Sequence, residues 1–246
     1  DKIWHLACPA SPVKYQVNPI KTSKTCFLGT YNMLELAKIN NAKILLASSS
    51  EIYGNPQINP QSETYTGCVN TTGVRSCYEE GKRISETLCS DYRRVHNLQI
   101  SIIRIFNTFG PKMSPDDGRV ISNFIVQCLK GENLTIYGNG NQTRSFCYVD
   151  DLVDGMIKVM DGNYSQPINI GSPVELTILE IANKIRNLIN PDLEFIFEPL
   201  PEDEPKKRQP DIKKIIEEFN WQPKISIDEG LILTINWFKK NQKFLF

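Results

Sequence analysis

The sequence lacks several features that would place a protein in a broad class at once. Its 28 basic and 28 acidic residues leave no net charge, so it has no general cationic excess with which to hold a nucleic acid. No apolar run approaches the roughly 18–20 residues that a membrane-spanning helix needs. The seven cysteines contain no Cys-x-x-Cys pair, and there are only two histidines. A disulfide scaffold or a metal site is therefore not expected, and we expect free thiols in a reducing cytoplasm.

The alternation of short apolar runs with helical patterns predicts an α/β fold. The expected strands are residues 3–7, 43–48 and 100–106, and the expected helices between them are about 19–40 and 76–96. Helical crossovers between buried strands give a doubly wound parallel sheet with helices on both faces. We assign this sheet to residues 1–110. Residues 111–246 are expected to form mainly a smaller mixed α/β lobe, with some segments returning to the first unit.

Helix-capping signals mark several boundaries in this pattern. Asn18, followed by proline, begins the first long helix, and Thr177 forms a capping box with the glutamate three residues later. Asp150 or Asp151 is expected to cap a helix that reaches about residue 160, and Asp211 to cap a short one.

Polar residues follow the predicted strands, at the edge of a parallel sheet where ligands bind. Ser48–Glu51 follows the middle strand, and Arg104–Pro111 contains the end of the next one. Tyr78 and Lys82 are four residues apart on a predicted helix, so they share a face. A nearby ammonium favours phenolate, which would let Tyr78 act as a base near neutral pH. A surface pair and a polar turn are the alternative interpretations.

These segments resemble the extended short-chain dehydrogenase/reductase family that acts on nucleotide sugars, and within it the UDP-glucuronic acid decarboxylases. Further matching segments are Ala7–Pro12, Asn18–Thr22, Cys77–Arg83, Asp117–Val120 and Gln142–Val149. The resemblance covers nearly the whole chain. It implies a Rossmann-like fold, NAD as cofactor, and conversion of UDP-glucuronate to UDP-xylose through a UDP-4-keto intermediate. Another nucleotide-sugar 4,6-dehydratase or a 4-epimerase is the alternative. Ser50-Glu51, where dTDP-glucose dehydratases carry Asp-Glu, favours decarboxylation.

The resemblance also implies roles for individual residues. Tyr78 would take the proton of the sugar 4-hydroxyl, and Lys82 would lower the pKa of Tyr78 and hold the nicotinamide ribose. Ser49 would complete the proton relay, while Glu51 and Arg208 would serve decarboxylation and reprotonation at C5. The residues matching NAD contacts are Leu6, Cys8, Thr25, Ala47, Tyr78, Lys82 and Thr108. Those matching substrate contacts are Lys24, Asn32, Tyr92, Asn107, Arg119, Arg144 and Arg208.

One family feature is absent from the sequence. The family's chain begins with a strand and a Gly-x-x-Gly-x-x-Gly turn, which lets the backbone approach the cofactor's pyrophosphate at a helix N-terminus. Neither occurs here, so we expect the family's first strands to precede Asp1. An inactive UDP-binding fragment is the alternative. The resemblance further implies a homodimer formed through helices 19–40 and 76–96, with neither nucleic acid nor a membrane as partner.

Overall fold

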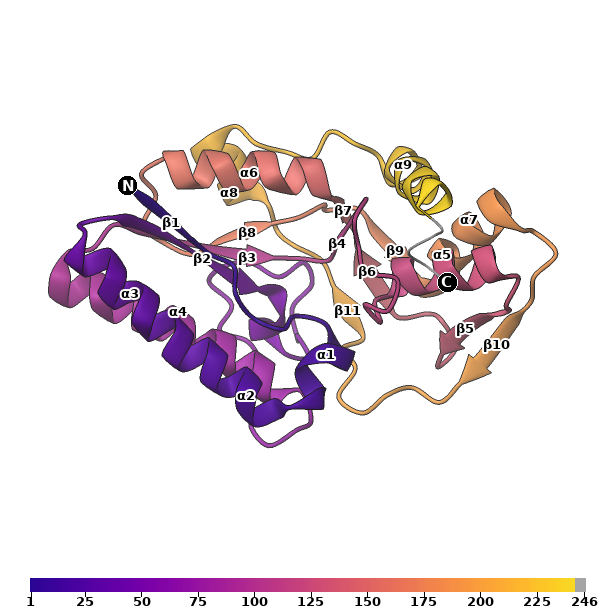
Figure 1. The fold of residues 1–246 in the computed structure, drawn as a ribbon, viewed down its shortest axis with the longest axis horizontal. Helices are drawn as coiled ribbons and strands as arrows, with labels where there is room; N and C mark the ends of the chain where they lie inside the picture. The colour runs from indigo at the N-terminus through magenta and orange to yellow at the C-terminus, as the bar shows by residue number, and fades with distance from the viewer. Residues whose placement is uncertain (242–246) are drawn as a thin grey trace.

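The structure of this chain, a computed structural model, describes residues 1–241. Its first half is built around a parallel four-stranded sheet (Figure 1). The strands in spatial order are β1 (Lys2–His5), β2 (Lys43–Ser49), β3 (Ile100–Ile105) and β8 (Ile168–Ile170). The connecting helices are α1 (Pro12–Val17), α2 (Pro19–Lys24), the π-helical turn η1 (Thr25–Gly29), α3 (Thr30–Ile39), the 3₁₀ turn η2 (Ser50–Tyr53) and α4 (Ser76–His96). This arrangement confirms the predicted α/β class.

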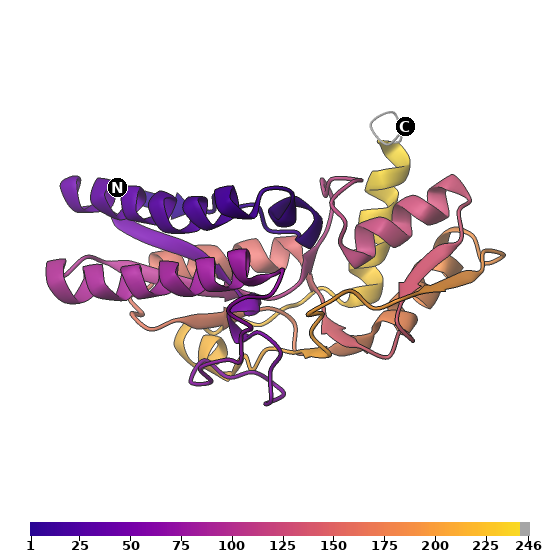
Figure 2. The same ribbon diagram turned by 90° about the horizontal axis from the view of Figure 1, so that it is seen from below.

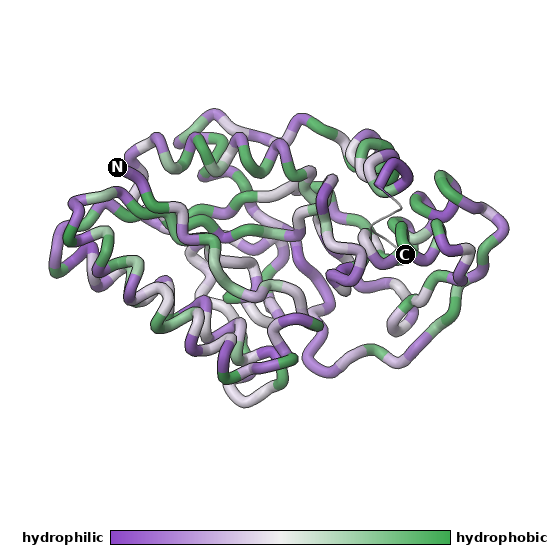
Figure 3. The backbone as a smooth tube through the Cα atoms, viewed as in Figure 1, coloured by the Kyte–Doolittle hydropathy of each residue, from purple (hydrophilic) through white to green (hydrophobic). Residues whose placement is uncertain are grey.

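Helices cover both faces of the sheet. The helices α3 and α4 lie side by side on one face (Figures 1 and 2) and bury Leu34 and Cys89 against Ile44 and Ile102. The helices α6 (Val149–Asp161) and α8 (Lys213–Phe219) pack on the other face. Since neighbouring strand residues point to opposite faces, strands buried on both sides are mostly apolar along their whole length. Figure 3 shows this hydrophobic character along the central strands.

A smaller lobe with its own apolar core follows the first strands. Its core contains Phe124 and Ile125 of α5, Ile181 of α7 and Phe238 of α9. Its helices are α5 (Val120–Lys130), α7 (Ile178–Ile189) and α9 (Ile227–Lys240). Its strands are β4 (Thr108–Phe109) with β7 (Cys147–Tyr148), β5 (Leu134–Tyr137) with β10 (Phe195–Glu198), and β6 (Thr143–Ser145) between β9 (Glu175–Thr177) and β11 (Lys207–Arg208). Between these elements the chain returns to the first sheet through α6, β8 and α8.

Two of the predicted helix starts are confirmed. The Asn18 side chain accepts the Lys21 N–H at 2.9 Å, and the capping box of Thr177 with Glu180 is present. The first long helix is nevertheless not regular throughout, because η1 interrupts it between α2 and α3. The separate helix α1, with its cap at Ser11, lies outside the predicted elements.

The two aspartate caps were predicted wrongly. The cap position of α6 is Tyr148, which makes no side-chain capping bond. Asp151 lies inside the first turn, and its carboxylate accepts the backbone N–H groups of Lys224 and Ile225 at 3.0 and 2.8 Å. The cap position of α8 is Ile212, although Asp211 accepts the N–H of Lys213 at 3.0 Å. In the case of Asp151, backbone N–H groups from a distant segment donate to the carboxylate that the local sequence would assign to a helix cap.

Among residues 1–241, no helix combines the length and apolar character needed to cross a bilayer. That same part of the chain contains no group of three His, Cys, Asp or Glu side chains suited to a metal ion.

Candidate active site

The carboxyl ends of the central strands converge with one face of α4. Ser49 is the last residue of β2, and η2 begins directly after it. The Lys82 ammonium on α4 donates a hydrogen bond of 2.7 Å to the carbonyl of Ala47 in β2. Leu6 follows β1, and Thr108 begins β4 shortly after β3 ends. The predicted cofactor contacts Leu6, Ala47, Lys82 and Thr108 thus lie at or beside the edge that sequence reasoning selected.

Tyr78 is buried in this edge rather than exposed on the helix. Only 4% of its surface is accessible, and its ring stacks on Tyr15 with centroids 4.9 Å apart and planes 2° from parallel. The Lys82 Nζ lies 5.7 Å from the Tyr78 ring centroid. Burial raises the pKa of the Tyr78 phenol above its ordinary value, against smaller lowering effects of a hydrogen bond with Ser49 and the charge of Arg119. Desolvation is thus the largest influence on this phenol in the structure, and the role of Lys82 in its ionisation stays a prediction.

Arg208 reaches the same edge from the second lobe. In β11 it pairs with β6, and its guanidinium contacts Ser50 Oγ at 3.2 Å and Glu51 Oε1 at 3.4 Å. It also donates to the Gly54 carbonyl at 2.9 Å. Gly54 has a φ of 60°, and a Cβ there would lie 1.9 Å from the Cys68 carbonyl oxygen, so this turn requires glycine. Arg208 Nε is buried and has no partner among the described residues.

Glu51 is held between two arginines. Its carboxylate is hydrogen-bonded by Arg75 as well as by Arg208. Burial alone would raise the pKa of Glu51, but the charges of Arg208 and Arg75 outweigh it and lower that pKa to about 2. Glu51 is therefore ionised at neutral pH.

The cluster contains functional groups that sequence reasoning missed. Arg75 also contacts Glu79 at 3.4 Å and Glu204 at 2.9 Å, so one guanidinium holds three carboxylates. Burial raises the pKa of Glu79 to about 7, with Glu51 adding to the effect and Arg75 opposing it. Arg75 precedes Tyr78 by three residues, about one helical turn, and that spacing was a usable signal. Nothing local marked Tyr15 or Glu204.

Two predicted substrate arginines lie in the neighbourhood with different partners. Arg144 is buried, and its guanidinium donates to Glu204. Its other terminal nitrogen donates to the Thr143 carbonyl at 2.8 Å, so in this structure protein groups engage both ends of the guanidinium that was assigned to the substrate. Arg119 lies at the start of α5, 3.3 Å from Asp117, and its charge acts on Tyr78. Asn107 is half-buried, and its carbonyl accepts the Cys147 N–H at 2.9 Å.

One predicted substrate contact is not brought to this edge. Tyr92 is fourteen residues beyond Tyr78 on α4, which is about 21 Å along a helix. Its hydroxyl bonds to Glu35 of α3, so its assignment to the substrate is corrected to an interhelical contact. Asn32 is exposed on α3, and Lys24 is exposed at the end of α2. Of the predicted cofactor contacts, Thr25 begins η1 and Cys8 lies in the turn after β1.

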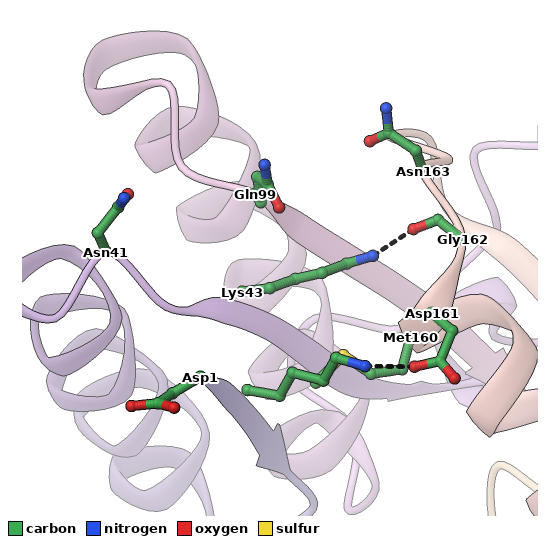
Figure 4. Close-up of a pocket in the computed structure, with 9 residues that line it drawn as sticks. Asp1, Asn41, Lys43, Gln99, Met160, Asp161, Gly162 and Asn163 are labelled. Carbon is green, nitrogen blue, oxygen red and sulfur yellow. Dashed lines mark hydrogen bonds and ion pairs between the residues drawn. The ribbon is translucent and has the colours of Figure 1, made fainter.

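A separate hollow lies at the opposite, amino-terminal end of the strands (Figure 4). Its volume is about 700 Å³, and residues of β1, β2 and α6 line it. Within it Lys2 pairs with Asp161, and Lys43 donates to the Gly162 carbonyl. Each of these two lysine ammonium groups thus has a protein partner, and the hollow contains none of the predicted site residues.

Known proteins resemble this chain in both sequence and fold. The sequence model of the family described as GDP-mannose 4,6 dehydratase matches residues 1–234. UDP-glucuronic acid decarboxylase 3 of Arabidopsis thaliana is 57% identical over 233 residues, which are 95% of this chain and 68% of that protein. UDP-glucuronic acid decarboxylase 1 of Xenopus tropicalis is 50% identical over 240 residues, 98% of this chain and 57% of that protein. The chain thus spans only part of each relative.

Two solved structures share the fold. UDP-glucose 4-epimerase of Thermotoga maritima, with UDP-glucose, has a TM-score of 0.92 at 26% identity and covers 98% of this chain and 78% of its own. UDP-glucuronic acid 4-epimerase of Bacillus cereus, in complex with UDP-glucuronic acid and NAD, has a TM-score of 0.88 at 27% identity and covers 98% and 76%. With half or more of its residues identical to several decarboxylases, and with this fold, the chain belongs to the extended short-chain dehydrogenase/reductase family, in the group of UDP-glucuronic acid decarboxylases.

Proposed function

We propose that this chain carries the catalytic centre of a UDP-glucuronate decarboxylase that forms UDP-xylose and recycles NAD. The observation that carries the proposal is the ionised Glu51–Arg208 pair beside Ser49, Tyr78 and Lys82. The reaction has a redox step and a decarboxylation step. Ser49, Tyr78 and Lys82 are assigned to the first, and the Glu51–Arg208 pair is assigned to the second. In this proposal residues 1–110 hold the cofactor, and residues 111–246 mainly hold the UDP-sugar.

The residues at the strand ends fit the nicotinamide end of NAD. Lys82 donates one hydrogen bond to Ala47, and an ammonium has two further N–H donors of the kind that ribose hydroxyls accept. NAD, when bound, would accept the hydrogen and electron pair of sugar C4 and later return them. The Tyr78 hydroxyl is assigned the transfer of the 4-hydroxyl proton, with Ser49 hydrogen-bonded to it. Because burial raises the pKa of Tyr78, ligand binding must favour its phenolate for it to act as a base.

Glu51 and Arg208 are assigned to the loss of carbon dioxide and the protonation at C5. Because Glu51 is ionised, the proton that C5 takes up is assigned to Arg208, which recovers a proton from water. A β-keto acid decarboxylates readily because its electrons pass into the ketone as an enolate. Glu51 is ionised, so its charge repels the carboxylate of the bound sugar and favours loss of that carboxylate as carbon dioxide. Arg208 Nε has no partner among residues 1–241, and its N–H groups are suited to stabilising the developing enolate.

The diphosphate of the substrate needs cationic donors in the second lobe. Arg119 and Arg144 have the planar forks that donate paired hydrogen bonds to phosphate. Arg144 is engaged by Glu204 in the structure, so it can serve the substrate only if that carboxylate withdraws. Asn107 is half-buried and follows the end of β3 by two residues. It is assigned to binding the sugar.

The direct test is incubation of this chain with UDP-glucuronate and NAD, with UDP-xylose detected by chromatography and NMR. Calorimetry with UDP-glucuronate measures binding separately. Formation of UDP-xylose and carbon dioxide, lost in Tyr78→Phe, supports the proposal. Dehydration of dTDP-glucose, 4-epimerisation without loss of carbon dioxide, or binding without turnover would instead identify a dehydratase, an epimerase or an inactive binding fragment.

We also propose a homodimer formed through the helix pair on one face of the sheet. Large apolar side chains are exposed along α2, η1, α3 and α4, a composition typical of interfaces: Ile20, Phe27, Leu28, Tyr31 and Ile84. Sedimentation equilibrium tests this with Phe27→Glu, for which we expect a monomer. Ile157→Glu, an exposed position on α6, serves as the control and should remain a dimer. A monomeric unsubstituted chain at micromolar concentration would contradict the assignment.

The proposed location is the cytoplasm. All seven cysteines are free, which is typical of a reducing compartment. Microscopy of the fluorescently tagged protein, with a secreted marker as reference, tests this location.

A further inference from the structure

Two cysteines from different elements meet beside the Tyr78–Lys82 face of α4. Cys8 lies in the turn after β1, and Cys26 lies in η1. Their Sγ atoms are 3.2 Å apart, although eighteen residues separate them in sequence. Cys8 is partly accessible, whereas Cys26 is buried. One thiol is therefore open to small solutes, and the other is held directly behind it.

The charges around the pair make its two thiols chemically different. A hydrogen bond from Cys26 lowers the pKa of Cys8 to about 7, with burial opposing and the Lys82 charge assisting. The hydrogen bond with Cys8 and burial raise the pKa of Cys26. Since the thiolate is the nucleophile in thiol oxidation, Cys8 is the attacking group and Cys26 is its thiol partner. This pairing matches the arrangement of a redox-sensing cysteine next to a resolving one.

Cys26 is also packed against the catalytic helix. A Cβ built on Gly81 would lie 2.9 Å from both Cβ and Sγ of Cys26, so this sulfur contacts α4 at the turn between Tyr78 and Lys82. The hydroxyl of Ser85 on α4 donates to the Cys26 carbonyl at 3.0 Å. The Cys26 side chain therefore lies against the part of α4 that carries Tyr78 and Lys82.

We propose that Cys8 and Cys26 are an oxidative modification site, at which peroxide drives formation of a reversible disulfide. The Cys8 thiolate attacks one oxygen of hydrogen peroxide, which forms sulfenic acid and releases hydroxide. The Cys26 sulfur then attacks the Cys8 sulfur, and water leaves as the S–S bond forms. In sum two thiols and one peroxide give one disulfide and two waters, and an external dithiol reverses the bond.

The required movement is small. An S–S bond is about 2.05 Å long, so the two sulfurs must approach by roughly 1 Å. Cys8 lies in an irregular turn, and Cys26 lies in a π-helical segment, a local irregularity frequent at functional sites. Neither cysteine lies in a regular α-helix or strand. Because the disulfide would remove the anionic sulfur near Lys82 and pull on the α4 contact, we expect oxidation to reduce the proposed decarboxylase activity, a consequence that rests on the proposed function.

Disulfide mapping tests the site without reference to activity. The folded chain is treated with a small excess of hydrogen peroxide, alkylated, digested and analysed by mass spectrometry. We expect two of the seven thiols to be lost, a Cys8–Cys26 peptide to appear, and dithiothreitol to restore both thiols. Cys128→Ser, in the core of the second lobe, should give the same peptide. Cys26→Ser should instead accumulate oxygenated Cys8.

Two outcomes would overturn the proposal. All seven thiols could survive the peroxide treatment, or the cross-linked peptide could join other cysteines. Activity is followed in parallel, with a tenfold or greater, dithiothreitol-reversible loss expected on oxidation. If the fully reduced chain forms no UDP-xylose, the proposed function fails while the mapping result still decides the disulfide site.

Discussion

Replacing Glu51 with glutamine tests the charge cluster that joins the two lobes. Glutamine keeps the shape of the side chain and removes its charge. The structure places the pKa of Glu51 at about 2 instead of its ordinary 4.5, because Arg208 and Arg75 outweigh burial. That difference corresponds to about 3 kcal/mol of preferential stabilisation of the carboxylate in the folded protein. We therefore expect Glu51→Gln to lower the free energy of unfolding at pH 7 by about that amount.

The pH dependence follows from the direction of the shift. The pKa of Glu51 is depressed on folding, so its contribution is complete well above pH 4.5 and is lost as the pH falls towards 2. The stability gap between the unsubstituted chain and Glu51→Gln should therefore shrink to about half near pH 3. Comparison of the two proteins at each pH cancels the titration of carboxylates far from Glu51. It does not cancel that of Glu79, whose pKa burial and Glu51 raise to about 7, so the gap is compared between pH 5 and pH 3, well below that value.

Urea unfolding, followed by tryptophan fluorescence at several pH values, measures this gap. The matched control is Glu218→Gln, an exposed position on α8, which should change stability by less than about 0.5 kcal/mol. The two substitutions could instead lower the free energy of unfolding by the same amount, or the stability difference between the unsubstituted chain and Glu51→Gln could stay constant from pH 5 to pH 3. Either result would show that the ion pairs of Glu51 do not contribute as the structure indicates.

Three further substitutions test the catalytic edge and the packing that supports it. Tyr78→Phe should lower kcat by about 10²–10⁴-fold and leave calorimetric binding of UDP-glucuronate nearly unchanged, so an unaltered kcat would remove Tyr78 from the proton transfer. Gly155→Ala should lower the free energy of unfolding by roughly 1–3 kcal/mol, because the new Cβ would lie 2.8 Å from Trp221 Cε2; a stabilised variant in urea unfolding would show that α6 is not so tightly packed. Asp151→Ala removes the acceptor of two backbone N–H groups and should cost about 2–4 kcal/mol in the same assay, whereas no loss would show that these bonds form with water instead.

Much of the fold could be predicted because its determinants are local. Strands buried on both faces favour mainly apolar runs, and residues 43–48 and 100–106 show them apart from a few polar positions such as Ser101 and Arg104. The Asn18 cap and the capping box at Thr177 involve residues three apart, so their hydrogen bonds are readable from sequence. Where a distant group competes for the same atoms, local reasoning fails. Asp151 binds a loop more than seventy residues away instead of capping its own helix.

The candidate site divides in the same way. Tyr78 and Lys82 were recognisable because four residues bring side chains to one face of a helix. Tyr92 lies on that helix too, yet rise along the axis carries it away from the site and onto Glu35. Spacing alone fixes the direction in which a helical side chain points, whereas its neighbours depend on what packs against that level of the helix.

The local pattern of residues was enough to specify the parallel sheet, its ligand edge, the Tyr78–Lys82 pair and the family to which the chain belongs. It could not specify the return of the chain that sets Arg208 against Glu51 and Glu204 against Arg144. Nor could it reveal that Cys8 and Cys26 meet beside α4. Hydrophobic periodicity and hydrogen bonds between near neighbours act within a few residues of sequence. Ion pairs, thiol contacts and pKa values depend on burial and on groups that only the packing of distant segments brings within a few ångströms.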